Sequence, residues 1–245
     1  MVGLEGRRGR AKHVSDRGGS QRARAEPPAA DFERGAILFD LDGVLVDSTE
    51  CIRRNWSEWA VRHGLDPTAV IRAAQGRRTI ETVRAVAPQL DPDVELAALA
   101  SDESRETEGV REVPGARELL AALPAGRWAV VTSAVRAAAE LRLRHVGLPV
   151  PAVLVAADEV SHGKPHPEGY LVAAAALGTP PADCLVVEDA PAGIEAAQSG
   201  GMAVIALATS HPAAALAAAD ALVPSLSCLR VTVRAGRLVI NLQRS

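Results

Sequence analysis

Short apolar runs that alternate with helical patterns constrain the fold of this chain more than any other feature. Five such runs occupy residues 36–39, 128–131, 152–155, 184–187 and 203–207. Each run is continuously apolar, which is typical of strands buried on both faces of a parallel sheet. Helical patterns lie between them, so the sequence predicts strand–helix–strand units and an α/β, Rossmann-like parallel sheet core. Residues 229–241 alternate around Ala235-Gly236 and predict a closing β-hairpin.

One stretch interrupts this alternation. Residues 50–112 contain several helical patterns and no strand-like run, and Ile52, Trp56, Trp59 and Ala60 recur at the spacing of one helix face. We therefore expect an inserted all-helical cap domain at 50–112, with the α/β core formed by residues 35–49 and 113–245. The two tryptophans are expected in the cap's own core rather than in a pocket wall, because their spacing alone accounts for them.

Residues 1–34 differ from the rest in composition. They carry eight Lys and Arg against five Asp and Glu, with few apolar residues and no periodicity. This pattern predicts a disordered basic extension, either a solvated tail or the result of an upstream start codon. A basic arm that binds a partner is the alternative. The segment lacks the apolar stretch of a secretory signal.

Composition argues against several function classes. No apolar run approaches the roughly 18 residues of a membrane helix, so no membrane partner is expected. A net charge of −3 and an aromatic content of 2% argue against nucleic acid as a partner. Cys51, Cys184 and Cys228 are too widely spaced for a zinc knuckle and indicate reduced thiols in a cytoplasmic protein.

Polar side chains follow four of the five predicted strands, where an open parallel sheet binds its ligands. Taken singly, acids at such positions often cap the next helix. Four chemically complementary sets in this order favour one active site instead. In chain order the sets are Asp40 with Asp42, Thr132 with Ser133, Lys164, and Glu188 with Asp189.

Each set has a chemical interpretation. Asp40 and Asp42 are two residues apart in a chain leaving a strand, so both can face one reacting centre. Crowded carboxylates without histidine or thiolate favour a hard cation, hence Mg²⁺. The hydroxyl groups and backbone N–H groups around Ser133 can hold phosphate oxygens at a helix start. Lys164 supplies a point charge for an anion.

These residues carry a resemblance to a known family. Residues 39–48 (FDLDGVLVDS), 131–133 (VTS), 163–167 (GKPHP) and 187–193 (VEDAPAG) resemble the four motifs of the haloacid dehalogenase superfamily, across roughly residues 35–243. The helical insertion is similar to the small cap of its β-phosphoglucomutase-like branch. Residues 56–64 and 107–109 resemble sugar and hexitol phosphate phosphatases, whose relatives act on 2-deoxyglucose 6-phosphate and glycerol phosphate.

The resemblance implies a Mg²⁺-dependent phosphatase that hydrolyses small sugar or polyol phosphate monoesters through an aspartyl-phosphate. Asp40 would be the nucleophile. Asp42 would protonate the leaving alkoxide and then deprotonate the attacking water. Mg²⁺ would be held by Asp40, the backbone carbonyl of Asp42 and Asp189, with Glu188 as a further ligand or as a partner of one.

The same resemblance assigns the substrate contacts. Thr132, Ser133 and Lys164 would hold the non-bridging phosphate oxygens. Arg78 lies in the segment 76–79, which is either a solvated helix start or a cap loop that contacts the substrate, as similar caps do.

Related chemistries can be compared with the residues present. Haloacid dehalogenases lack the second acid of the first motif, which is Asp42 here, and phosphonoacetaldehyde hydrolases need a cap lysine, which residues 50–112 lack. A sugar phosphomutase stays open, as does a non-catalytic phosphosugar-binding regulator. A zinc site at His162 and His166 is not expected, because Pro165 separates them and no third ligand is near. The protein is expected to be a monomer or weak dimer.

Overall fold

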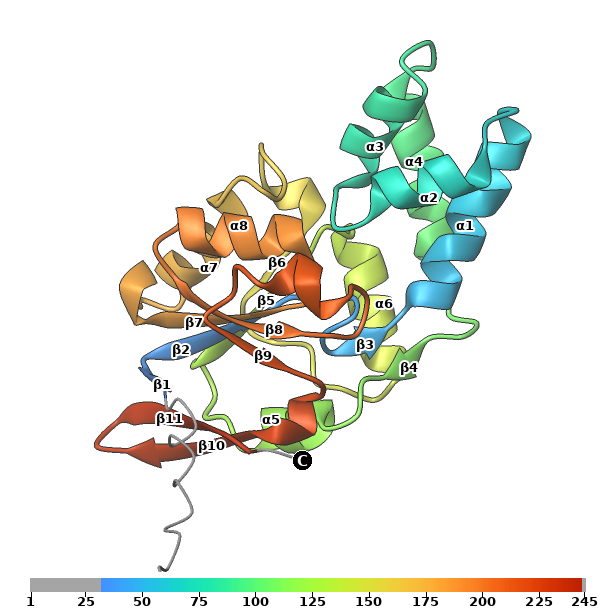
Figure 1. Ribbon diagram of the computed structural model, residues 1–245. Helices are drawn as coiled ribbons and strands as arrows, with labels where there is room; N and C mark the ends of the chain where they lie inside the picture. The colour runs from blue at the N-terminus through green and yellow to red at the C-terminus, as the bar shows by residue number, and fades with distance from the viewer. Residues whose placement is uncertain (1–31, 244–245) are drawn as a thin grey trace, which may run out of the picture.

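A six-stranded parallel sheet forms the centre of the protein (Figure 1). The computed structural model describes residues 32–243. The strand order is β6-β5-β2-β7-β8-β9, which confirms the predicted α/β core. The strands are β2 (Ala36–Phe39), β5 (Trp128–Val131), β6 (Leu154–Val155), β7 (Cys184–Glu188), β8 (Ala203–Leu207) and β9 (Ala221–Val223).

Two edge strands differ from the sequence prediction. The run at 152–155 yields only the two-residue β6, which pairs with the last two residues of β5. Strand β9 was not predicted, because three residues are too few to show a pattern, and it forms by pairing with β8.

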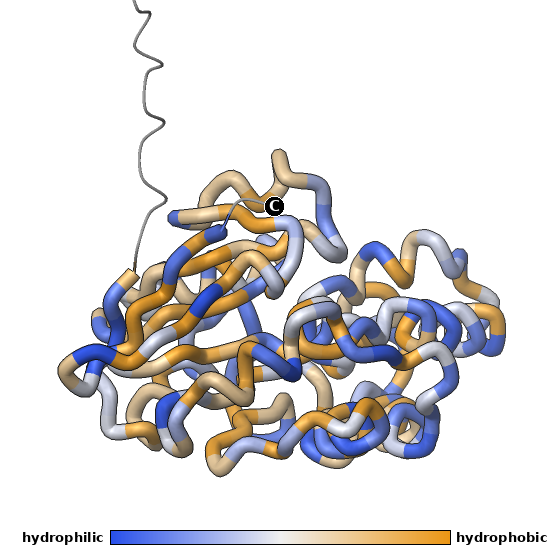
Figure 2. The backbone as a smooth tube through the Cα atoms, turned by 90° about the horizontal axis from the view of Figure 1, so that it is seen from below, coloured by the Kyte–Doolittle hydropathy of each residue, from blue (hydrophilic) through white to orange (hydrophobic). Residues whose placement is uncertain are grey.

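Helices cover both faces of the sheet, which explains why its strands are apolar throughout. Alternate residues of β2 point to opposite faces: Ala36 and Leu38 pack with α7 and α8, whereas Ile37 and Phe39 pack with α5 and α6. Figure 2 shows the apolar residues gathered along the sheet strands. Among residues 32–243, no helix is both long and apolar enough to cross a membrane. The core helices are α5 (Ala116–Ala121), α6 (Arg136–His145), α7 (Glu168–Ala176) and α8 (Pro191–Ser199), with short 3₁₀ turns at Ala157–Glu159, Pro181–Asp183, Ala213–Leu216 and Leu226–Cys228.

A separate three-stranded antiparallel sheet packs against α5. The predicted hairpin is present as β10 (Leu229–Arg234) and β11 (Arg237–Leu242), turning at Ala235-Gly236, where both residues have positive φ. A third strand, β1 (Phe32–Arg34), pairs with β11. The basic extension predicted for residues 1–34 is therefore wrong at its end: residues 32–34 belong to the core, and residues 1–31 lie outside the described residues. Three residues show no periodicity on their own, and it is pairing with β11 that makes them a strand.

The insertion consists of four helices with a core of their own. Trp56, Trp59, Val70, Val83 and Leu99 are buried together, and the indole N–H of Trp59 donates to a Glu95 carboxylate oxygen at 2.8 Å. Asp66 and Asp91 cap α2 and α4, each ahead of a proline in the first turn. The helices are α1 (Thr49–Arg62), α2 (Pro67–Ala74), α3 (Thr79–Val86) and α4 (Pro92–Glu103), and the antiparallel strands β3 (Val46–Asp47) and β4 (Arg111–Glu112) lie where the chain enters and leaves them.

The place of β1 in the fold can be tested by Phe32→Ala. The Phe32 ring is buried in the cluster that contains Leu238 and Ile240. Its loss should lower the unfolding free energy by about 3 kcal/mol, the lower end for a Phe→Ala change because Phe32 lies on an edge strand. For a chain of this size that is a fall in melting temperature of roughly 6–12 °C, measured by calorimetry. The control Val233→Ala removes a half-exposed side chain of β10 and should change stability by less than about 0.5 kcal/mol. An unchanged melting temperature for Phe32→Ala would contradict the packing of β1.

Candidate active site

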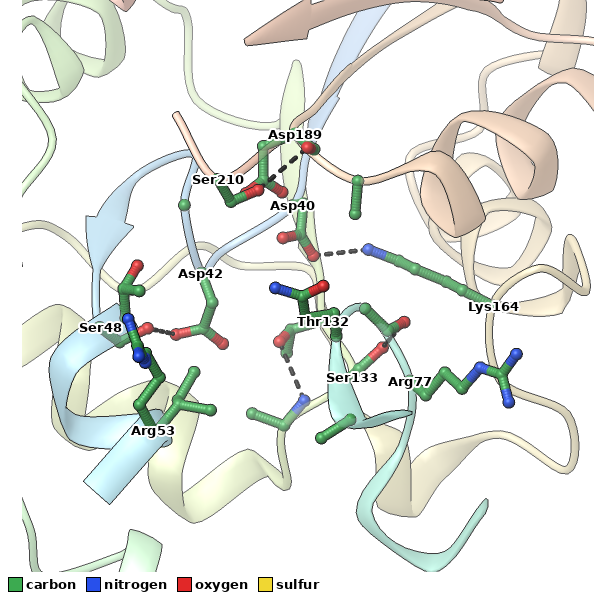
Figure 3. Close-up of a pocket in the computed structure, with 18 of the residues that line it drawn as sticks. Asp40, Asp42, Ser48, Arg53, Arg77, Thr132, Ser133, Lys164, Asp189 and Ser210 are labelled. Carbon is green, nitrogen blue, oxygen red and sulfur yellow. Dashed lines mark hydrogen bonds and ion pairs between the residues drawn. The ribbon is translucent and has the colours of Figure 1, made fainter. Parts of the chain in front are cut away.

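The carboxyl ends of β2, β5 and β7 meet at the edge of the sheet that faces the cap. Asp40 directly follows β2, Thr132 follows β5, and Glu188 ends β7 immediately before Asp189. These side chains line one cavity together with cap residues (Figure 3). The cap supplies both polar and apolar side chains to the cavity: Thr49, Ile52, Arg53, Trp56, Ile71, Gln75 and Arg77. Trp56 therefore belongs to the cap core and also lines the cavity, whereas Trp59 belongs to the cap core and does not line the cavity.

A buried ammonium group joins two of the acids. Lys164 Nζ lies 2.5 Å from Asp40 Oδ1 and 2.6 Å from Glu188 Oε1. The Tyr170 hydroxyl donates to the same Glu188 oxygen at 3.1 Å, and Nζ stands 5.2 Å from the centre of the Tyr170 ring. Lys164 comes from the loop after β6 and Tyr170 from α7, so these contacts fix that loop against the end of β7.

Glu188 is fully engaged by the protein. Its second oxygen, Oε2, accepts hydrogen bonds from the backbone N–H groups of Asp189 at 2.7 Å and Ala190 at 2.8 Å. A Cβ at Gly193 would lie only 1.6 Å from Glu188 Oε1, so α8 needs a glycine there. With both oxygens bonded, Glu188 holds Lys164 and the start of α8 in place.

Asp189 approaches the loop after β2 closely. Gly43 has φ of +85°, and a Cβ there would meet Asp189 Oδ2 at 1.9 Å. Glycine is therefore needed at this position both for its backbone conformation and for space. Ser210, which the sequence did not single out, lies beside Asp189 and donates from Oγ to its carbonyl at 3.0 Å (Figure 3).

The site carries more negative than positive charge. Oxygen atoms of Asp40, Glu188 and Asp189 all lie within 4.8 Å of one another. Burial raises the pKa of Asp40 to about 7; Lys164 acts against this rise, and Glu188 and Asp42 add to it. Burial, then Glu188 and Asp40, raise the pKa of Asp189 well above its ordinary value. Although burial opposes its charge, Lys164 has a pKa held well above the usual range by the two acids it contacts.

Asp42 also lines the cavity, but its carboxylate points away from Asp40, toward Ser48 and α6 (Figure 3). Ser48 Oγ donates to Asp42 Oδ1 at 2.5 Å, and Arg142 Nη1 lies 3.0 Å from each carboxylate oxygen. The sequence prediction missed Arg142. A signal was present, because Arg142 follows Ala138 and Ala139 at helix spacing and so stands on the buried face of α6.

The two predicted hydroxyl groups lie at the end of β5. Thr132 is buried, and its Oγ1 accepts from the backbone N–H of Ala134 at 3.1 Å. Ser133 Oγ donates to the carbonyl of Gly76 in the cap at 3.2 Å. Thr132 therefore belongs to the sheet edge, while Ser133 also joins the core to the cap.

The structure does not bring Arg78 into the main cavity, where substrate contact was one of two expectations. Its Nε donates to Glu81 at 2.8 Å, and its two terminal nitrogens donate to the carbonyls of Val160 at 2.9 Å and Ser161 at 3.0 Å. These carbonyls satisfy the guanidinium, so Arg78 ties the cap to the loop that carries Lys164. Its neighbour Arg77 lines the cavity instead.

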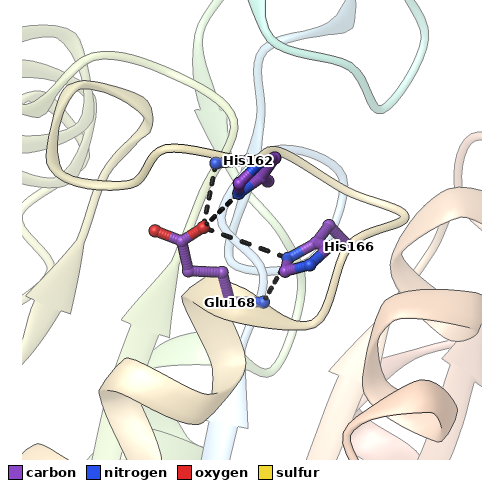
Figure 4. Close-up of side chains that lie close together, drawn as sticks. All are labelled: His162, His166 and Glu168. Carbon is purple, nitrogen blue, oxygen red and sulfur yellow. Dashed lines mark hydrogen bonds and ion pairs between the residues drawn. The ribbon is translucent and has the colours of Figure 1, made fainter.

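A cluster of His162, His166 and Glu168 braces the same loop (Figure 4). The expectation that no third ligand-type residue is near the histidines was wrong: Glu168 Oε2 lies 2.9 Å from His162 Nδ1 and 4.0 Å from His166 Nδ1. The Glu168 carboxylate also accepts from the backbone N–H groups of Ser161 at 2.7 Å and His162 at 3.0 Å. These bonds account for its position, since they close the loop on either side of Lys164.

The comparisons with known proteins agree with this geometry. Residues 35–201 match the family described as haloacid dehalogenase-like hydrolase. Hexitol phosphatase A of Escherichia coli is 42% identical over 201 residues, covering 80% of this chain and 93% of that protein. Validoxylamine A 7'-phosphate phosphatase of Streptomyces hygroscopicus is 40% identical over 203 residues, covering 79% and 94%. Among solved structures, β-phosphoglucomutase of Clostridium difficile has the same fold, with a TM-score of 0.67 and 23% identity over 80% of this chain and 93% of that one.

The family match spans both sides of the cap insertion, from the strand before Asp40 to the helix after Asp189. It therefore covers all four sets of polar residues predicted from the sequence. This chain belongs to the haloacid dehalogenase-like hydrolase family.

Proposed function

We propose that this protein is a Mg²⁺-dependent phosphatase that hydrolyses small sugar or polyol phosphate monoesters through an aspartyl-phosphate on Asp40. The observation that carries the proposal is the buried Asp40–Lys164 contact in a cavity lined by residues of both the core and the cap. Relatives named for hexitol and validoxylamine phosphates support this substrate class. A cavity wall with both polar and apolar side chains, such as Arg53, Gln75 and Ile71, suits a small polyol.

The acidic cluster fits a hard divalent cation. It offers oxygen ligands alone. Burial raises the pKa values of Asp40 and Asp189, the neighbouring acids add to this rise, and Lys164 acts against it. Asp40, Asp189 and the backbone carbonyl of Asp42 would hold the ion, while Glu188 already uses both oxygens within the protein. When bound, the ion supplies positive charge beside the transferring phosphoryl group.

In the proposed reaction each of these side chains has a separate role. Lys164 engages Asp40 Oδ1, which leaves Oδ2 for attack on phosphorus. As the new oxygen–phosphorus bond forms, the bond to the substrate alkoxide breaks, and Asp42 gives its proton to that oxygen. Asp42 then takes a proton from water, which attacks the aspartyl-phosphate and releases inorganic phosphate and free Asp40. Lys164 and Thr132 stabilise the charge on the phosphoryl oxygens.

The reaction itself is tested by phosphate release from a panel of sugar, polyol and nucleotide phosphates, ranked by kcat/KM. Hexitol and other polyol phosphates should rank first. Asp40→Asn should abolish turnover, because an amide does not form the acyl-phosphate, whereas the exposed cap substitution Asp93→Asn should leave it unchanged. An isomerised sugar phosphate without phosphate release would indicate a mutase. Saturable binding without either product would indicate a regulator.

The metal assignment predicts a pH-dependent effect of Mg²⁺ on stability. The folded protein raises the Asp40 pKa from 3.8 to about 7, so it holds this proton more tightly than the unfolded chain does. Without metal, its unfolding free energy should fall as pH rises from about 4 to about 7. Mg²⁺ at a hundredfold excess over its Kd should add about 2.7 kcal/mol near pH 7.5, or roughly 5–10 °C in melting temperature. The increment should be smaller near pH 5.

Asp189→Asn serves as the matched variant, because it keeps the size of the side chain and removes a ligand charge. Its Mg²⁺ increment should largely disappear, as measured by scanning fluorimetry with and without chelator. If Mg²⁺ raises the melting temperature of Asp189→Asn as much as that of the parent protein, the acidic cluster is not the metal site.

Lys164→Arg tests the role of the buried ammonium. Arginine provides 25 of the 27 cations of this chain, yet a lysine stands between Asp40 and Glu188. A planar guanidinium is wider than an ammonium and does not fit contacts of 2.5 Å and 2.6 Å to two acids. We expect kcat to fall at least ~10-fold, with a larger loss for Lys164→Ala. The exposed substitution Arg144→Lys should have no effect, and full activity of Lys164→Arg would show that Lys164 is an ordinary loop cation.

A further inference from the structure

Two histidines and a glutamate gather on the loop between β6 and α7 (Figure 4). One ligand-type atom of each of His162, His166 and Glu168 lies within 4.8 Å of the other two. Glu168 Oε2 is 2.9 Å from His162 Nδ1 and 4.0 Å from His166 Nδ1. None of the three residues lines the cavity that contains Asp40. Two nitrogen donors and one carboxylate oxygen therefore converge at a second place in the core.

The backbone brings the two histidines together. The N–H of His166 donates to the carbonyl of Gly163 at 2.9 Å and closes a turn around Lys164 and Pro165. The imidazole rings of His162 and His166 consequently lie side by side, with their centres 4.6 Å apart, although a proline separates the two residues in the sequence. With 66% and 52% of their side chains exposed, both histidines are accessible to ions from solution.

Glu168 is held in place as an ionised carboxylate. Its Oε1 accepts from the backbone N–H of Ser161 at 2.7 Å, and its Oε2 accepts from the backbone N–H of His162 at 3.0 Å. The bond from Ser161, followed by the bond from the His162 side chain, lowers the pKa of Glu168. Hydrogen bonds of this kind orient a carboxylate that ligates a metal ion.

The two Nδ1 atoms that face Glu168 differ in protonation. An ionised carboxylate only accepts hydrogen bonds, so His162 Nδ1 carries the proton of its contact with Glu168. His166 Nδ1 accepts from the backbone N–H of Glu168 at 3.3 Å, so it carries no proton. A metal ion that binds both nitrogens would therefore release one proton from His162 to solvent and replace the long hydrogen bond of His166.

The spacing and the chemistry of these atoms suit a transition-metal ion. Zn²⁺ binds nitrogen and carboxylate oxygen at about 2.0–2.2 Å in a tetrahedron, which places ligand atoms roughly 3.3 Å apart. The separations of 2.9 Å and 4.0 Å lie on either side of that value, and rotation of two exposed imidazoles adjusts them. Imidazole ligands favour Zn²⁺, Cu²⁺ and Ni²⁺, whereas Mg²⁺ prefers oxygen ligands.

We propose that His162, His166 and Glu168 form a second metal site, which takes a divalent transition-metal ion such as Zn²⁺ and leaves the fourth ligand position to water. The site is separate from the acidic cluster proposed for Mg²⁺, and it does not depend on the proposed phosphatase function. Because its ligands stand on both sides of Lys164, a bound ion ties the two ends of that loop together and stabilises the folded protein.

Isothermal titration calorimetry of the untagged protein with Zn²⁺, in excess Mg²⁺ to occupy the acidic cluster, tests the site. The parent protein should bind Zn²⁺, and a hundredfold excess over the measured Kd should raise its melting temperature by roughly 5–10 °C. His162→Gln and His166→Gln should each weaken Zn²⁺ binding at least ~10-fold. The control His145→Gln removes an exposed histidine at the end of α6 and should leave Zn²⁺ binding unchanged.

The two histidine variants should keep the melting temperature of the parent protein in the absence of Zn²⁺, because the replaced rings are exposed and Glu168 retains its backbone hydrogen bonds. Asp189→Asn, which removes a ligand of the acidic cluster, should retain Zn²⁺ binding at this second site. Zn²⁺ binding that persists in both histidine variants and is lost in Asp189→Asn would place the ion in the acidic cluster and overturn the inference. A parent protein that binds no Zn²⁺ would overturn it as well.

Discussion

The contact of Lys164 with Asp40 and Glu188 is the interaction on which the site depends. Burying several carboxylates at the end of a parallel sheet is unfavourable unless positive charge lies among them. The ammonium provides part of that charge, and the residues around it are arranged to keep it there. Tyr170 and the N–H groups at the start of α8 fix Glu188, and the Glu168 brace closes the loop from which Lys164 extends. The rest of the negative charge remains available for a metal ion.

The fold of the core could be predicted because both faces of its sheet are buried. Continuous apolar runs such as 184–187 follow directly from that burial, and polar residues after the runs meet at one edge by topology alone. Lone residues in the sequence, such as Lys164 and Asp40, are thus brought within contact distance across 124 positions of the chain. The elements that could not be predicted are β1 and β9, two short edge strands without a recognisable sequence pattern. They form because β11 and β8 offer them backbone hydrogen bonds.

The cap residues show a second limit of sequence reasoning. Arg77 and Arg78 are adjacent and chemically identical, yet one lines the cavity and the other is bound by Glu81 and the carbonyls of Val160 and Ser161. The difference arises from the direction each side chain takes at the start of α3, which no local pattern encodes. Arg142 was missed for a related reason, because a buried arginine in an arginine-rich helix looks like a surface cation until its apolar neighbours on the same face are considered.

The contacts between cap and core differ in kind from the contacts within each of them. The principal ties on the cavity side are polar: Ser133 to the Gly76 carbonyl, Arg78 to the loop that carries Lys164, and Arg142 toward Glu103. The apolar clusters, by contrast, are separate, with the cap tryptophans in one and the sheet residues in the others. Each apolar core stabilises its own part of the fold. The polar contacts between the two parts can be replaced by hydrogen bonds to water at little net cost in free energy. Opening the cavity therefore disrupts hydrogen bonds rather than a hydrophobic core. Each of these three contacts involves a candidate site residue or its neighbour: Ser133 itself, the loop that carries Lys164, and Arg142 beside Asp42. The polar contacts between cap and core are therefore also contacts of the candidate active site.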